Sequence, residues 1–222
     1  NRMRPAVTVL QLDTQFPRIP GDVACPETYL DKIEIIRIPK ASVSHIVTED
    51  PNQIDIQPFI TAMQASKGDI ITTSCGFLAS RQKDLQSVSM RPVLASALVS
   101  LPRLAAIKQS ISVLTFDHKK LISGQVKLLK NHVKQVIGLH SETHLRNVIE
   151  LDSLTLDQHK AGSEIKTIIE TELAPTCKCL LMECTNLPPY KSVIREAFKG
   201  SISDILTEIE FLRPGTINPT FL

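Results

Sequence analysis

Two apolar segments, each running straight into a cysteine, constrain the fold of this chain most strongly. Residues 180–190 read LLMECTNLPPY, an apolar run followed by Cys184, short polar residues and two prolines. Residues 69–79 repeat this design, with Cys75 in the place of Cys184. An apolar run followed by a tight turn and helical spacing predicts a buried strand that leads into a helix. We therefore expect each cysteine at the carboxyl end of a strand, where open α/β sheets bind their ligands.

Strand and helix patterns alternate along the rest of the chain. Apolar runs predict strands over residues 7–12, 33–38, 69–73, 88–90, 111–115, 133–139 and 178–182. Helical spacing predicts helices over residues 52–66, 76–86, 92–107, 118–130, 154–173, 189–198 and 202–212. Such alternation is typical of an α/β fold with parallel sheets. The two cysteine segments lie about half the chain apart, which suggests two similar halves whose thiols meet across a cleft.

Composition disfavours several classes of partner. The 222 residues are 42% hydrophobic and 22% charged, with a net charge of +2, so no basic surface for nucleic acid is indicated. Aromatic residues make up only 4% of the chain and Trp is absent, which disfavours a stacking platform for bases. No apolar run approaches the roughly 18 residues of a membrane span. The expected partner is a small molecule rather than nucleic acid or a membrane.

The cysteine count and the glycine pattern bear on compartment and cofactors. Five cysteines without regular spacing disfavour a disulfide framework, and free thiols predict a reducing compartment, most simply the cytoplasm. Neither of the glycine-rich phosphate-binding motifs occurs, so no nucleotide cofactor is indicated. Cys177 and Cys179 lack the C-x-x-C spacing and the histidines are scattered, so no metal site is expected.

A loop rich in Pro and Gly follows the first strand. Residues 15–22 read QFPRIPGD, and the irregular stretch continues to about residue 29. A loop of this length directly after a strand is usually functional. Arg18 and Asp22 are candidates for ligand contact there, and an ion pair that only pins the loop is the alternative.

A cysteine just before a helix suits acid–base chemistry. The helix dipole and the free backbone N–H groups favour the thiolate and lower the thiol pKa from an ordinary value of about 8.5. Backbone N–H groups that could hold a carboxylate between the thiols belong to Gly76, Phe77, Thr185 and Asn186. Additional hydroxyl donors belong to Thr73, Ser74 and Thr185. One thiolate could remove a proton beside the carboxylate and the other thiol could return one to the opposite face. A purely structural role as small buried residues is the alternative for both cysteines.

The chain resembles the aspartate/glutamate racemase superfamily. The resemblance is carried by LMECTNLP at residues 181–188 and TTSCGF at 72–77, and it extends to LDT at 12–14, PRIPGD at 17–22 and VLTFD at 113–117. It implies two similar α/β domains, related by a pseudo-two-fold axis, with the active site in the cleft between them and no cofactor. It also implies that Cys75 and Cys184 are the catalytic acid and base. Substrate-side positions implied by the resemblance are Asp13, Thr14 and Thr115.

Two departures from the family pattern leave the substrate open. Glutamate racemases usually have Asn-Thr after the first cysteine, where this chain has Gly76 and Phe77, and a His where it has Asn186. The resemblance implies a racemase or epimerase that transfers protons at the α-carbon of a small carboxylate, such as aspartate or glutamate. The alternatives are a maleate-type cis–trans isomerase or a decarboxylase that uses Cys184, and a non-catalytic carboxylate-binding protein.

The superfamily plan also divides the chain. It implies a first domain of residues 1–95 plus 200–222 and a second domain of residues 96–199. Members of the superfamily often form homodimers, which makes a homodimer the assembly that the resemblance implies.

Overall fold

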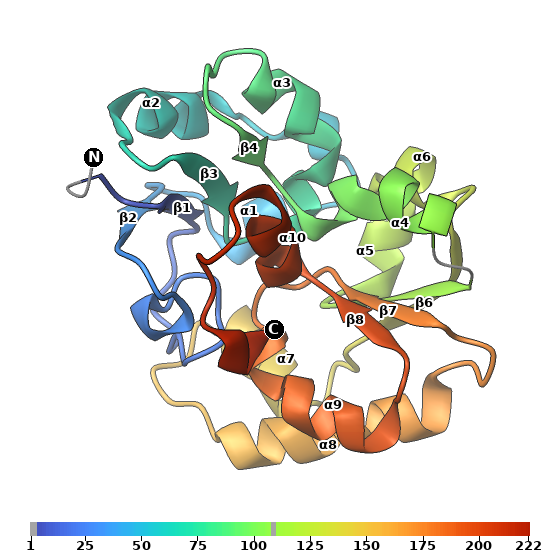
Figure 1. Ribbon diagram of the computed structural model, residues 1–222. Helices are drawn as coiled ribbons and strands as arrows, with labels where there is room; N and C mark the ends of the chain where they lie inside the picture. Colours follow the sequence, from blue (N-terminus) through green and yellow to red (C-terminus); the bar gives the residue numbers. More distant parts are fainter. Residues whose placement is uncertain (1–3, 108–109) are drawn as a thin grey trace.

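The computed structural model describes residues 4–107 and 110–222, and they form two four-stranded parallel sheets (Figure 1). The strand order is β2-β1-β3-β4 in the first sheet and β6-β5-β7-β8 in the second. The strands are β1 Val7–Gln11, β2 Ile33–Arg37, β3 Ile70–Thr73, β4 Val93–Leu94, β5 Ile111–Thr115, β6 Val133–Gly138, β7 Cys179–Met182 and β8 Ser201–Ser203. Because the second sheet repeats the order of the first, the expected α/β fold with two similar domains is confirmed.

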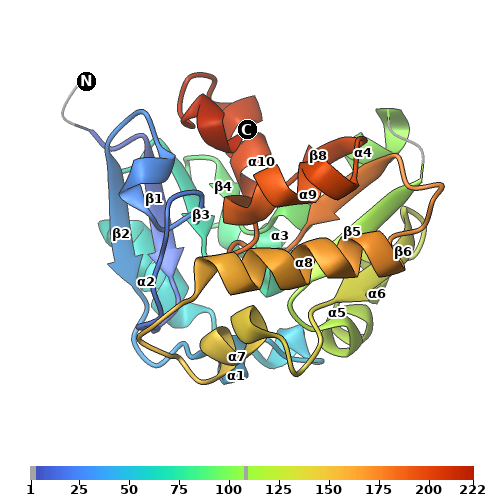
Figure 2. The same cartoon turned by 90° about the horizontal axis from the view of Figure 1, so that it is seen from below.

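Helices connect the strands and cover the sheets (Figure 2). Their bounds are α1 Val43–Ile46, α2 Gln57–Ala65, α3 Gln82–Gln86, α4 Leu101–Ile107, α5 His118–Gly124, α6 Val126–Leu129, α7 His144–Glu150, α8 Gln158–Glu172, α9 Lys191–Ala197 and α10 Ile205–Leu212. Helices α8 and α9 run side by side along the second sheet (Figures 1 and 2). The inner strands β1, β3, β5 and β7 are buried along their whole length, as expected of parallel strands covered on both faces.

The region after β3 differs from the sequence prediction. The strand predicted at 88–90 is wrong, because these residues form a turn, and β4 pairs with β3 through Ile71 and Val93. Within the helix predicted over 92–107, the structure has β4, a 3₁₀ helix at Ala97–Ser100 and then α4 from Leu101. Pro102 therefore lies in the first turn of α4, where no backbone N–H is needed.

Other helix starts also lie later or earlier than predicted. The long helix predicted from residue 154 begins at Gln158, because the Asp157 side chain accepts a hydrogen bond from the Lys160 backbone N–H. The helix α7, which the sequence patterns do not predict, begins at His144. The closing helix predicted from residue 202 is preceded by strand β8, and Asp204 caps α10 in a capping box with Thr207.

The C-terminal segment returns to the first sheet. Leu206 and Ile209 of α10 pack in one apolar cluster with Val7 and Val9 of β1. Ile217 forms an antiparallel bridge with Tyr29 in the loop after β1. The domain boundaries near residues 95 and 200 remain a prediction, and residues 1–3 and 108–109 of those ranges lie outside the described residues.

The strand order places the site. In the first sheet β2 pairs on one side of β1 and β3 pairs on the other, and β6 and β7 flank β5 in the same way. The strand order therefore reverses between β1 and β3 and between β5 and β7. Ligands of open α/β sheets bind at the carboxyl ends of the strands beside such points. Cys75 follows β3 and Cys184 follows β7. None of the helices in the described part of the chain is long and apolar enough to cross a membrane.

Candidate active site

A small cavity lies where the carboxyl ends of the two sheets meet, and both cysteines line it. Its volume is about 30 Å³. Since one water molecule needs about 10–15 Å³ of such space, the closed cavity holds only about two waters. The first domain contributes Cys75 and its neighbours, and the second contributes Cys184 and its neighbours. The cavity adjoins a wider one of about 350 Å³, with which it shares Thr14, Phe116 and Ile149.

The structure brings most of the predicted substrate-side residues together. Those that line the cavity with the two cysteines are Thr14, Ser74, Gly76, Phe77, Thr185 and Asn186. Thr73 lies outside it, with a hydroxyl that donates to the Ala95 backbone oxygen at 2.8 Å. Thr115 also lies outside it and donates to the Glu183 carboxylate. Asp13 is exposed and lines a neighbouring, wider cavity of about 350 Å³.

The ends of the strands hold the two thiols in place. The Ser74 hydroxyl accepts a hydrogen bond from the Leu12 backbone N–H at 2.9 Å, which ties the end of β3 to the end of β1. The 3₁₀ helix Gly76–Arg81 begins directly after Cys75. In contrast to the prediction, no helix begins directly after Cys184, because the next 3₁₀ helix starts at Pro188.

Burial outweighs the helix ends in setting the pKa of both thiols. The pKa of Cys75 is raised to about 12, first by burial and then by the nearby Glu183 carboxylate, although the Phe77 backbone N–H and Arg18 oppose the rise. Burial, followed by Glu183, also raises the pKa of Cys184 well above its ordinary value. The expected lowering of the thiol pKa is therefore wrong for the closed cavity, since desolvation disfavours the charged thiolate. A positive charge near either thiol would favour its ionisation.

Glu183 is a cavity residue that the sequence prediction did not include. Its carboxylate accepts a hydrogen bond from the Thr115 hydroxyl at 2.5 Å, and burial raises its pKa to about 7. A Cβ atom at Gly76 would lie 2.2 Å from Glu183 Oε2, so only glycine leaves room for this side chain. The available signal was an acidic residue at the end of an otherwise apolar strand.

The loop after β1 reaches the cavity through Arg18. Both sequence interpretations apply, because Arg18 pairs with Asp22 at 3.4 Å and also lines the cavity. Arg18 Nη2 donates to the Thr14 hydroxyl at 2.9 Å, and the guanidinium lies over the Phe16 ring at 4.3 Å. Arg18 Nε is buried without a hydrogen-bond partner. A buried donor left unpaired is costly, and an acceptor oxygen of a ligand would satisfy it.

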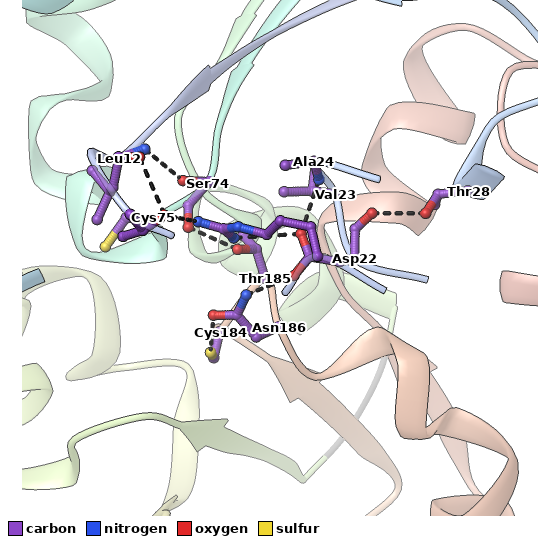
Figure 3. A network of polar contacts seen from close by, with 12 residues as sticks. Leu12, Asp22, Val23, Ala24, Thr28, Ser74, Cys75, Cys184, Thr185 and Asn186 are labelled. Atoms are coloured by element: carbon purple, nitrogen blue, oxygen red, sulfur yellow. Dashed lines mark hydrogen bonds and ion pairs between the residues drawn. The ribbon is translucent and has the colours of Figure 1, made fainter. Parts of the chain in front are cut away.

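Three contacts join the domains around the cavity. The Asn186 amide donates to Asp22 Oδ2 at 2.6 Å, and the Cys184 thiol donates to the Asn186 amide oxygen at 3.5 Å (Figure 3). The Thr185 hydroxyl donates to the Ser74 backbone oxygen at 2.7 Å. Asp152 accepts hydrogen bonds from the backbone N–H groups of residues 15 and 16 at 2.7 and 2.9 Å. The contacts of Asp22 and of residues 15 and 16 hold the β1–β2 loop against the second domain, and the Thr185 contact holds the segment after β3 against it.

The described residues contain no group of three or more His, Cys, Asp or Glu side chains arranged to hold a metal ion. The ionisable groups that line the cavity are its two thiols, the Glu183 carboxyl and the Arg18 guanidinium.

Comparison with known proteins changes the expected reaction. No family model matches the chain. It is 26% identical over 240 residues to dimethylsulfoniopropionate lyase 5 of Emiliania huxleyi, covering 99% of this chain, and it spans about half (47%) of that protein's length. It is 24% identical to dimethylsulfoniopropionate lyase of Durusdinium sp. clade D, covering 100% of this chain and 78% of that protein. These relatives support an enzyme, and they overturn the racemase expectation because they are named lyases.

Solved structures bear on the fold. Picrophilus torridus aspartate racemase is 12% identical with a TM-score of 0.58, and the match covers 97% of each chain. Allantoin racemase from Pseudomonas fluorescens is 14% identical with a TM-score of 0.65, covering 93% of this chain and 90% of that one. Glutamate racemase from Francisella tularensis is 14% identical with a TM-score of 0.54, covering 99% of this chain and 85% of that one. The chain thus has the fold of the aspartate/glutamate racemase superfamily.

Proposed function

We propose that this protein is a lyase that eliminates a leaving group from the β-carbon of a small carboxylate, with dimethylsulfoniopropionate as the first substrate to test. The relatives named above support this reaction class. The observation that carries the proposal is the shared cavity, in which thiols from both domains lie beside a buried guanidinium with an unpaired Nε.

Arg18 is the proposed anchor for the substrate carboxylate. Its Nε–H is buried and unpaired, while its other nitrogens contact Thr14 and Asp22. A carboxylate oxygen would satisfy this donor with a charge-assisted hydrogen bond, which is about twice as strong as a neutral one. The loop that carries Arg18 would thereby orient the carbon beside the carboxylate toward the thiols.

The reaction needs one base. A thiolate of Cys75 or Cys184 takes the proton from the carbon next to the carboxylate. The electron pair of that C–H bond forms the double bond to the β-carbon, and the bond from the β-carbon to sulfur breaks. The sulfur keeps the bonding pair and leaves as neutral dimethyl sulfide, while acrylate and a protonated thiol remain. Because the leaving group is neutral, it needs no proton from the second thiol.

Separate replacement of the two cysteines tests this proposal. The protein is incubated with dimethylsulfoniopropionate, dimethyl sulfide is measured by headspace gas chromatography and acrylate by NMR. We expect the two products in equal amounts from the wild type. The Cys→Ser variant that lacks the base should be slower by about 10²–10⁴, the usual contribution of a general base, and the other variant should lose less.

Cys177→Ser is the matched control, because this buried thiol contacts the Cys179 backbone oxygen and lies outside the cavity. It should retain wild-type activity. The proposal fails if the wild type releases neither product, or if Cys75→Ser and Cys184→Ser are both as active as Cys177→Ser.

A further inference from the structure

We propose that Glu183 forms the subsite for a positively charged group of the substrate, so that the cavity selects carboxylates that also carry a cation. This inference rests on the proposed function and deepens it, because it assigns the part of the site that recognises the leaving group. The elimination chemistry alone requires only a base and a carboxylate anchor.

Glu183 is a buried carboxyl without a cationic partner. Only 2% of the residue is exposed, and no ion pair between described residues includes it. Its hydrogen-bond donors are neutral, the Thr115 hydroxyl and the Phe116 backbone N–H. Arg18, the cation that lines the same cavity, is paired with Asp22. Burying an unpaired charge is costly, and a bound cation would offset this cost.

The fold keeps space for this carboxyl at the boundary between the domains. Glu183 belongs to the second domain, and its Oε2 atom faces Gly76 of the first domain, where a Cβ would lie at 2.2 Å. Glu183 directly precedes Cys184, and Gly76 directly follows Cys75. Glu183 and Gly76 line the same cavity as both thiols.

The charge of Glu183 opposes ionisation of the thiols when the cavity is empty. The carboxylate raises the pKa of Cys75 and of Cys184, second only to burial in each case. A cation beside Glu183 would cancel this effect and favour the thiolate, because an opposite charge within about 4–6 Å stabilises the ionised form. The base would then become active when a cationic substrate binds.

The other walls of the cavity suit a methylated cation. Phe16, Phe77 and Phe116 line it, and aromatic faces attract cations whose charge is carried by methylated groups. Arg18 covers one face of the Phe16 ring and Arg146 one face of the Phe116 ring, so each of these rings has one further face for a ligand. A substrate with one carboxylate and one sulfonium would place the first at Arg18 and the second at Glu183. Each charge of the substrate is opposite in sign to the side chain that it contacts.

A pair of ligands that differ in one atom tests the subsite. In 3-(trimethylammonio)propionate the quaternary centre is a charged nitrogen, and in 4,4-dimethylpentanoate it is a neutral carbon. Dissociation constants of both are measured by calorimetry for wild type, Glu183→Gln and the control Glu196→Gln, whose carboxylate is exposed on α9. We expect wild type and Glu196→Gln to prefer the cationic ligand by about tenfold or more, and Glu183→Gln to show a ratio near one.

Thr115→Val provides a second variant, because it removes the hydrogen bond to Glu183 while leaving the carboxyl in place. It should reduce the ratio less than Glu183→Gln does. An unchanged ratio in both variants, or a wild-type preference for the neutral ligand, would overturn the inference. If the wild type eliminates dimethyl sulfide while the ratio stays near one, only the subsite is wrong. If it neither eliminates nor binds either ligand, the proposed function is wrong as well.

Discussion

At the scale of single residues, Glu183 is a buried carboxyl that lines the cavity, where its ionised form is disfavoured by desolvation. The carboxyl is held by Thr115 and given room by Gly76, and burial raises its pKa to about 7. A carboxyl whose pKa is higher in the folded than in the unfolded state binds its proton more tightly when folded. Its ionisation therefore lowers stability as the pH rises from about 4.5 to about 7.

Replacing this carboxyl should stabilise the protein at alkaline pH. Glu183→Gln removes the ionisation, so its stability advantage over wild type should grow by about 2.5 kcal/mol between pH 5 and pH 8, at 1.36 kcal/mol per pKa unit. Urea unfolding of both proteins at the two pH values measures the difference. The same difference at both pH values would show that Glu183 titrates normally.

At the scale of elements, the β1–β2 loop and the end of α7 close the cavity together. Asp152, two residues after α7, has a φ of 49° and accepts the backbone N–H groups of residues 15 and 16. Asp and Asn adopt this left-handed conformation more readily than most residues. The contact connects the loop that carries Arg18 to the second domain.

Loosening this contact should lower catalytic efficiency. Asp152→Ala removes both hydrogen bonds and disfavours the local backbone, so we expect kcat/KM for elimination to fall by about tenfold or more. Asp152→Asn retains an oxygen acceptor and should lose less. Hydrogen exchange at the amides of residues 15 and 16 should accelerate in the Ala variant. Wild-type exchange and kcat/KM in Asp152→Ala would show that the contact does not hold the loop.

At the scale of the whole molecule, a buried ion pair joins the C-terminal segment to the second domain. The Nζ atom of Lys191 on α9 lies 2.6 Å from Oδ2 of Asp204, and the two side chains are 3% and 0% exposed. Lys191 also donates to the Phe221 backbone oxygen at 2.7 Å. Since α10 packs on the first sheet, this pair lies where both domains and the chain end meet.

Breaking this pair on one side should destabilise the fold strongly. Lys191→Met leaves Asp204 buried and charged, and we expect a loss of about 3–5 kcal/mol in urea unfolding. Adding Asp204→Asn should restore part of the stability, because Asn removes the charge and still caps α10. If the double variant is no more stable than Lys191→Met, the charge left on Asp204 is not the cause of the loss.

The alternation of strands and helices, and the place of the two cysteines at strand ends, can be predicted from the sequence. Strand runs and helical spacing are local patterns, and parallel strands bring Cys75 and Cys184 to the carboxyl ends of their sheets whatever the details. Other predicted residues reach the cavity for the same reason. Ser74, Thr185 and Asn186 lie next to these cysteines in sequence, and Thr14 follows the first strand.

Other features depend on residues that are distant in sequence, and they can be seen only in the folded chain. The short strands β4 and β8 exist because β3 and β7 pair with them, which no local pattern reveals. The pKa of each thiol moves opposite to the prediction, because desolvation arises only when both domains close over the cavity. The same closure places Arg18 and Glu183 beside the thiols, with Gly76 of one domain leaving room for a side chain of the other.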